Sequence, residues 1–286
     1  MIEILQALHP AVLVAAVFLF GLLVGSFLNV VILRFPRQLL HDWQGQCREL
    51  LELEQVDEKA PPGLVKSRSH CPSCSKTIAW YDNIPVVSWM VLGRKCRHCD
   101  APISFRYPLV ELATAVLSAV VIWHFGPTAE GLAALVLTWT LIAATGIDID
   151  YQLLPDQITL PLLWLGLALN LMFGLFASLE DAVIGAIVGY GSLWLVYHGF
   201  RLATGKEGMG YGDFKLLGAL GAWMGWQVLP IIILGASLVG AVVGIALMIA
   251  TKRGKEIPIA FGPYLAAAGW IALLWGDRIL DYWLYV

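Results

Sequence analysis

The chain has 286 residues, of which 59% are hydrophobic and only 14% are charged. Soluble domains carry about 25% charged residues, so this composition excludes an ordinary soluble protein and indicates one that crosses a membrane several times. The net charge of −3 says little about function, because the charges are unevenly placed along the chain. We expect no nucleic acid among the partners of this protein.

A membrane-spanning helix needs about 20 mostly apolar residues. The runs that meet this need are residues 11–33, 107–125, 131–147, 157–176, 182–200, 214–229, 231–250 and 260–276. The fold expected is therefore an all-α polytopic membrane protein with about eight transmembrane helices. The first run is too long for the apolar region of a signal peptide, so we expect no cleavable signal peptide. The sixth run is short and rich in glycine.

The basic residues predict the orientation of these helices. Eleven of the eighteen Lys and Arg lie in residues 34–106, between the first and second spans, and basic residues favour the cytoplasmic side. Counting onward places both termini outside and three further segments on the cytoplasmic side. Those three segments are 148–156, 201–213 and 251–258. Two of them carry the acidic residues discussed below.

Four cysteines in the 34–106 segment form two CxxC pairs. They are Cys71, Cys74, Cys96 and Cys99. Two such pairs supply four thiolates for a tetrahedral zinc ion, and a reducing cytoplasm argues against disulfides. We expect a structural, zinc-ribbon-like site; redox-active or unrelated CxxC pairs are the alternative. Cys47 is expected to be a free thiol, and His98 not to be a ligand.

Two aspartates border apolar runs on the predicted cytoplasmic face. Asp148 ends the third span, and Asp213 precedes the sixth within the stretch GMGYGDFKLLGALG. Two carboxylates brought together share one proton, which is the arrangement of aspartic proteases. The glycines before Asp213, including Gly210 and Gly212, would let a substrate backbone approach. Asp150 and Asp156 are expected to be loop residues, with Asp156 a possible helix N-cap.

At these residues the sequence resembles the type IV prepilin peptidases, which are bifunctional leader peptidases and N-methyltransferases. The resemblance covers nearly the whole chain and includes the tetracysteine segment. Its other motifs are Gly210-Tyr-Gly212-Asp213, Asp148-Ile-Asp150 followed by Leu154-Pro155-Asp156, GSFLNV at 25–30, RYPLVELATA at 106–115 and FGPYLA at 261–266.

The resemblance implies the activity and the catalytic pair. The family removes the short basic leader of prepilins and pseudopilins after a glycine, and then methylates the new N-terminal amine with S-adenosylmethionine. It implies Asp148 and Asp213 as the catalytic residues, with Asp148 chosen because the family acid is the first of its Asp-x-Asp. It also implies the bacterial inner membrane, cytoplasm-facing active sites, periplasmic termini and the lipid bilayer as a partner.

Three parts of the chain are expected to have different roles. Residues 1–33 form the first helix, and residues 107–286 form a seven-helix aspartic peptidase domain. Residues 34–106 form the cytoplasmic tetracysteine domain, which with its flanking helices is the methyltransferase region. Substrate contacts are expected from Gly210, Gly212, Lys215 and Glu111.

The sequence indicates the methyl-donor site less clearly than it indicates the catalytic aspartates. Gly25, Ser26 and Asn29 make the first span unusually polar, which favours either helix packing through small residues or a role in methyl transfer. Glu111 lies inside the second span, where an acid is costly. It is expected to pair with Arg34 or Arg106, or to bind the substrate amine.

Two other functions fit parts of the sequence. An ion-coupled carrier with a structural zinc ribbon would also place acids near membrane helices, but such carriers often show internal repeats, and none is evident here. A peptidase without methyltransferase activity is the other alternative, although the retained cysteine segment favours two activities.

Overall fold

The computed structural model describes residues 9–54, 60–65, 67–251 and 260–284. These residues are helical with irregular connections and contain no β-strand, only two isolated bridges. The chain forms two compact units, residues 1–127 and 128–286. The expected all-α class is confirmed for the described residues.

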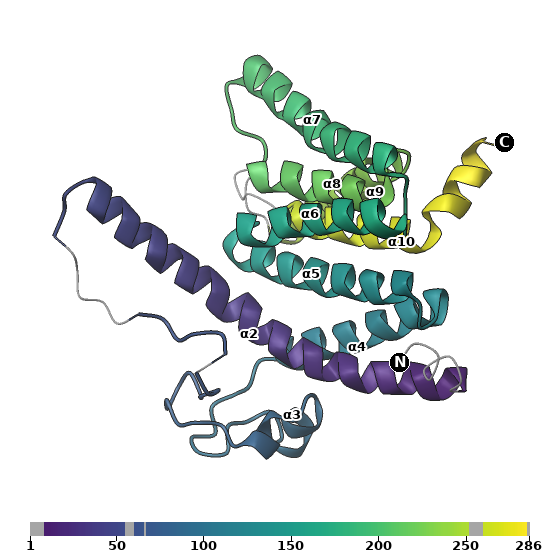
Figure 1. Cartoon of the computed structure of the whole chain (residues 1–286). Coiled ribbons are helices and arrows are strands. Elements are labelled where there is room, and N and C mark those ends of the chain that lie inside the picture. Colours follow the sequence, from purple (N-terminus) through teal and green to yellow (C-terminus); the bar gives the residue numbers. More distant parts are fainter. Residues whose placement is uncertain (1–8, 55–59, 66, 252–259, 285–286) are drawn as a thin grey trace. The chain divides into compact units, whose positions relative to one another are not determined.

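The first unit is built on two long helices, α2 (Pro10–Leu50) and α4 (Arg106–Phe125) (Figure 1). Glycines let them approach closely: a Cβ at Gly21 would lie 2.7 Å from Ala115 Cα, and a Cβ at Gly25 would lie 2.7 Å from Glu111 Cα. This small-xxx-small contact is typical of membrane helix pairs. Gly25 is therefore a packing residue.

Helix α2 is much longer than the apolar run 11–33 that predicted it. Its 41 residues span about 62 Å at 1.5 Å per residue, roughly twice the hydrocarbon thickness of a bilayer. An apolar run ends where the lipid ends, but a helix continues while its residues favour it, and residues 38–50 include three Leu and three Gln, both good helix formers. Pro36 is accommodated inside the helix.

The polar segment between α2 and α4 is mostly irregular. It contains a 3₁₀ turn, η1 (Trp80–Asn83), and the short helix α3 (Val87–Val91). Arg97 holds this segment together by donating from Nε and Nη2 to the two carboxylate oxygens of Asp82, at 2.7 and 2.6 Å. The hydrogen bond from Arg97 lowers the pKa of Asp82. Glu58, which is among the acids of the expected cytoplasmic domain, lies outside the described residues.

The second unit contains six helices among its described residues. They are α5 (Ala129–Tyr151), α6 (Asp156–Phe173), α7 (Leu179–Thr204), α8 (Tyr211–Met224), α9 (Leu229–Thr251) and α10 (Gly262–Leu284). Each begins within three residues of an expected span and ends within five, except that α10 continues eight residues beyond its expected end. Local signals explain the ends: Thr128 and Ser178 accept from backbone N–H groups at the starts of α5 and α7. Gly174 and Gly205 end α6 and α7 in the left-handed conformation.

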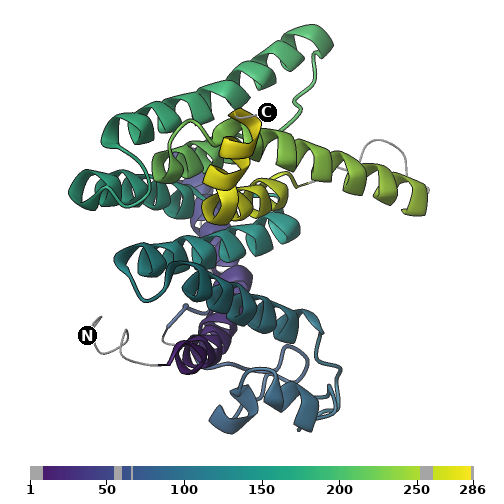
Figure 2. The ribbon, with the colours of Figure 1, turned by 90° about the vertical axis from the view of Figure 1, so that its right-hand side faces the viewer.

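Helix α8 is the centre of the second unit. It packs against α7, α6 and α10 (Figures 1 and 2), and every residue from Phe214 to Met224 except Lys215 is buried. Its glycines allow backbone contact with α7, since a Cβ at Gly221 would lie 2.2 Å from Gly185 O. The glycines of α8 therefore allow close helix packing, and this packing positions the residues at the start of α8.

Six described helices are long and apolar enough to cross a membrane: α2, α4, α5, α6, α7 and α9. Helix α8 is not among them, because its 14 residues span only about 21 Å. Helix α10, which carries Asp277, Arg278 and Asp281 near its end, is not among them either. The basic loop 251–258, which supported the predicted orientation, lies almost wholly outside the described residues, as do residues 1–8 and 285–286.

Candidate active site and metal centre

Asp148 lies near the end of α5, where the helix is about to terminate. Gln152 adopts the left-handed conformation, and its N–H donates to Asp148 O at 2.8 Å, which closes the last turn. The Asp148 side chain is only 5% exposed. Its Oδ2 accepts a hydrogen bond of 3.0 Å from Gly262 N, at the first residue of α10. The carboxylate is therefore fixed from a segment 114 residues further along the chain.

Asp213 lies in the first turn of α8 and is 6% exposed. Its N–H donates to Gly210 O at 3.2 Å, so the turn before it is closed by backbone. The negative charge of Asp148 acts directly on the Asp213 carboxyl group. The structure thus brings together the two aspartates that the sequence predicted as a pair.

Three connections meet around this pair, and their packing is tight. A Cβ at Gly262 would lie 2.6 Å from Asp148 Oδ2 and 3.0 Å from Leu154 Cδ1. A Cβ at Gly212 would lie 2.6 Å from Leu154 Cβ. Gly212 therefore allows the start of α8 to pack on the α5–α6 connection. Gly210, by contrast, has only a backbone atom of Gly212 at 4.0 Å, so the space beside it is open.

The charged residues near this aspartate pair differ from it in exposure and in their partners. Asp150 is exposed, unlike Asp148. Asp156 is the first residue of α6, with Pro155 at the N-cap, so its expected capping position was wrong by one residue. Its carboxylate instead accepts a hydrogen bond from Lys215 Nζ. Lys215 is thus placed with Asp156, and its expected role in substrate binding stays a prediction.

Glu111 lies in the first unit, on the face of α4 that packs against α2. It is 7% exposed. Its Oε2 accepts from Val86 N at 2.7 Å, and the Ser26 hydroxyl also bonds its carboxylate. Arg34, one of its expected partners, instead donates to the carbonyl oxygens of Gly63 and Ser67, both at 2.9 Å. The acid is therefore held by a backbone N–H and a hydroxyl, two donors that carry no charge.

The four cysteines of the two CxxC pairs come together as predicted. Their sulfur atoms all lie within 4.8 Å of one another, and Cys71 Sγ lies 3.8 Å from Cys99 Sγ. A tetrahedral zinc ion with Zn–S bonds of about 2.3 Å holds its sulfur atoms about 3.8 Å apart, so the cluster fits zinc. Cys47 is exposed and lies outside the cluster.

The two cysteine pairs are structurally equivalent turns. Ser75 N donates to Cys71 O at 2.9 Å, and Asp100 N donates to Cys96 O at 3.0 Å. Ser75 and Asp100 both have positive φ, 56° and 55°. The N–H groups of Cys74 and then Ser73 lower the pKa of the Cys71 thiol to about 6, which favours the thiolate that binds metal. His98 is exposed and is not part of the four-sulfur cluster.

Sequence reasoning missed three residues that complete these sites. Gly262 was noted only within the motif FGPYLA, and nothing in the sequence indicates that its N–H bonds Asp148. Ser26 and Val86 were not linked to Glu111. A buried acid inside an apolar helix must have donors nearby, but the sequence does not say which residues supply them.

Comparison with protein families matches the two halves of the chain separately. Residues 19–125 match the Bacterial Peptidase A24 N-terminal domain. Residues 135–245 match the Type IV leader peptidase family. Together the two matches cover most of the chain.

Three relatives carry the same printed name, prepilin leader peptidase/N-methyltransferase. The protein from Pseudomonas aeruginosa is 57% identical over 273 residues, 96% of this chain and 94% of the relative. The protein from Aeromonas hydrophila is 56% identical over 276 residues, 96% of this chain and 95% of the relative. The protein from Legionella pneumophila is 44% identical over 284 residues, 99% of both chains. No solved structure matches significantly.

Proposed function

The chain belongs to the type IV leader peptidase family, and we propose that it is a membrane aspartic endopeptidase that removes the leader of prepilins and then N-methylates the new N terminus. The observation that carries the peptidase proposal is the buried pair Asp148 and Asp213. The methyltransferase proposal comes from the relatives' names and from the matched N-terminal domain.

The chemistry proposed for the pair follows from its electrostatics. Two carboxyl groups that are brought together in a buried site share one proton at neutral pH, because two adjacent negative charges repel. The ionised member takes a proton from a water molecule, and the protonated member donates a hydrogen bond to the scissile carbonyl. The water oxygen then attacks the carbonyl carbon, and the proton passes to the leaving amine. Titration belongs to the pair and not to either residue.

The surroundings support this chemistry. The N–H of Gly262 holds the Asp148 carboxylate in place, and the open space beside Gly210 is where we place the peptide backbone of the substrate. Substrate contacts by Gly212, Lys215 and Glu111 stay predictions, as does the processing of pseudopilins.

We propose that the chain spans the bacterial inner membrane eight times, with both termini in the periplasm and the aspartate pair facing the cytoplasm. Eight large apolar residues of α9 are exposed, which suits a lipid-facing helix. They are Leu234, Leu238, Val239, Val242, Ile245, Leu247, Met248 and Ile249. Helices α8 and α10 would add two spans to the six that are apolar and long enough; α8 would need its flanking residues to complete the crossing.

The cofactors proposed are a structural zinc ion and S-adenosylmethionine. The four cysteines would hold the zinc and stabilise the polar segment, and the methyl donor would supply the transferred group. We assign the peptidase to 107–286 and the methyltransferase region to 34–106 with its flanking helices. No observation favours the ion-coupled carrier considered as the alternative.

A cleavage assay with three variants tests the peptidase proposal. The purified protein in detergent is incubated with a prepilin, and leader removal is followed by gel shift. Asp148→Asn and Asp213→Asn are expected to lower the rate at least about 100-fold, as for loss of a general acid or base. Asp150→Asn is the matched control, because its side chain is exposed. Normal cleavage by either of the first two variants would refute the dyad.

A further inference from the structure

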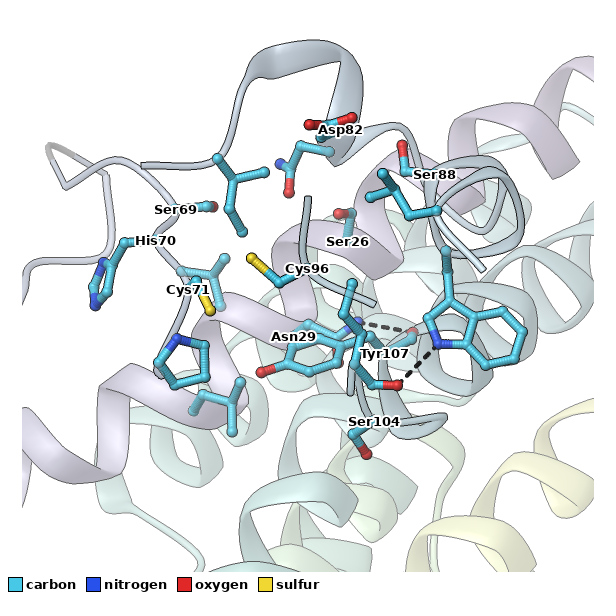
Figure 3. A pocket seen from close by; sticks show the side chains of 18 of the residues that line it. Ser26, Asn29, Ser69, His70, Cys71, Asp82, Ser88, Cys96, Ser104 and Tyr107 are labelled. Carbon is cyan, nitrogen blue, oxygen red and sulfur yellow. Dashed lines mark hydrogen bonds between the residues drawn. The ribbon is translucent and has the colours of Figure 1, made fainter. Parts of the chain in front are cut away.

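The first unit contains a cavity that the peptidase chemistry does not use. It has a volume of about 430 Å³ and is lined by α2, α4 and the polar segment between them. Figure 3 shows Ser26, Asn29 and Tyr107 around it, together with Cys96 and Ser88 of the polar segment. Its volume lies in the range of small-molecule sites, roughly 300–1,000 Å³.

One end of the cavity is negative. Glu111 lines it, and the two groups that bond its carboxylate, Val86 N–H and the Ser26 hydroxyl, are neutral. A buried carboxylate held by neutral donors is best complemented by a cation. Val86 has a φ of 59°, which is strained for a β-branched residue, and such strain is often found at ligand sites.

The other end of the cavity is positive. Arg34 and Arg37 line it, and they follow Ser26 by eight and eleven residues on the same helix. Eight residues of helix rise about 12 Å, so the two arginines lie well along α2 from the Glu111 end. The hydrogen bonds from Arg34 to Gly63 O and Ser67 O hold part of the polar segment over this end.

An aromatic side chain also lines the cavity. Trp89 lines the cavity, and its Nε1 donates to Ile103 O at 3.1 Å, so the ring is fixed in position. The guanidinium of Arg94 lies 4.9 Å from the centre of the Trp89 ring. A fixed indole offers a flat apolar surface to a heteroaromatic base.

We propose that this cavity binds the methyl donor, an adenosyl sulfonium amino acid, with its sulfonium facing Glu111 and its adenine base against the Trp89 ring. This inference rests on the proposed methyltransferase activity and assigns it a site. Within the methyltransferase region and its flanking helices, it assigns the donor to a site that includes Ser26, Asn29 and Glu111, residues of the two membrane helices.

The donor supplies an electrophilic methyl group: the C–S bond breaks with its electron pair left on sulfur, and a nitrogen lone pair forms the new N–C bond. The N-terminal amine must first release one proton to bulk water to free that lone pair. The product is then a methylated ammonium and a neutral thioether. The Glu111 carboxylate stabilises the sulfonium before transfer and has no such charge to stabilise on the thioether.

The loss of charge on sulfur gives a sharp test. Binding of S-adenosylmethionine and of S-adenosylhomocysteine, its uncharged thioether product, is measured by calorimetry on the zinc-loaded full-length protein. Glu111→Gln is expected to raise the Kd for S-adenosylmethionine about 10-fold or more, as for a lost contact with a charged group. The Kd for S-adenosylhomocysteine should change much less.

Two further variants make the result specific. Val30→Trp, at a cavity-lining position, should abolish binding of both compounds by filling the space. Glu49→Gln, at an exposed position on the same helix, is the matched control and should bind both normally. Prepilin cleavage and zinc content check that each variant is folded.

The outcomes separate the two proposals. If Val30→Trp and Glu111→Gln both bind S-adenosylmethionine like the wild type, the site assignment is wrong even when the protein methylates its substrate. If Glu111→Gln weakens both compounds equally, the sulfonium does not face Glu111. If the wild type cleaves prepilin but neither binds the donor nor methylates, the methyltransferase part of the proposed function itself fails.

Discussion

The two units bury acidic residues in different ways. In the second unit, the charge of Asp148 acts on Asp213, and Gly212 and Gly262 let the segments around the pair pack closely against Leu154. In the first unit, Glu111 is bonded by a backbone N–H and a hydroxyl and faces a cavity. Two acids close together share a proton and suit hydrolysis, whereas a single acid beside a cavity suits binding of a cation.

The units also differ in what stabilises them. The second unit is a set of helices that pack around α8. The polar segment of the first unit has little regular structure and is organised around four cysteine sulfurs. The metal should therefore matter far more to the first unit than to the second.

Among the changes that test this difference between the two units, removal of the metal should have the largest effect. Cys71→Ser removes one of the four sulfur ligands, and structural zinc supplies folding free energy directly. We expect zinc content and methylation to be lost, while the cleavage rate falls much less. Metal analysis with parallel cleavage and methylation assays checks this.

Cys47→Ser is the control, since Cys47 is exposed and outside the cluster. Unchanged zinc content in Cys71→Ser would refute the metal site. An equal loss of both activities would mean that the metal supports the two units alike.

A substitution at Gly262 should affect the second unit. In Gly262→Ala the new Cβ would lie 2.6 Å from Asp148 Oδ2, so the carboxylate must move. Misplacing a catalytic group by about 1 Å can cost 100-fold in rate, and we expect cleavage to fall about 10- to 100-fold. Methylation of an already cleaved pilin should be unaffected.

Gly191→Ala is the matched control, because nothing lies within 4 Å of a Cβ at that position. Steady-state cleavage kinetics on the two variants makes the comparison. A normal rate in Gly262→Ala would show that the position of Asp148 does not depend on α10.

The ion pair between Lys215 and Asp156 should have the smallest effect. Their side chains are 26% and 52% exposed, and exposed pairs contribute roughly 0.2–1 kcal/mol. A double-mutant cycle with Lys215→Ala and Asp156→Asn, followed by thermal unfolding, should give a coupling free energy in that range. A large loss of cleavage in Lys215→Ala alone would instead support its predicted role in substrate binding.

The sequence predicted features that depend on local pattern. Apolar runs located the helices, and the CxxC spacing located the sulfur cluster. Counting spans placed Asp148 and Asp213 at one face, and the structure brings them together at the same end of the second unit.

Features that depend on distant contacts were not predictable. The bond from Gly262 to Asp148 joins residues 114 positions apart, and no local pattern encodes it. The helical continuation of α2 past residue 33 was missed because hydropathy reports lipid contact and not helix length. The partners of Glu111 were missed because one of them is a backbone N–H, and any residue other than proline can supply one.

Mass spectrometry of a prepilin treated with two variants tests the central claim most directly. The claim is that the acids of the second unit cleave and the acid of the first unit serves methyl transfer. Asp213→Asn should leave the prepilin intact, and Glu111→Gln should release a cleaved but unmethylated pilin. Cleavage by Asp213→Asn, or a methylated or an uncleaved product from a folded, zinc-loaded Glu111→Gln, would contradict the account.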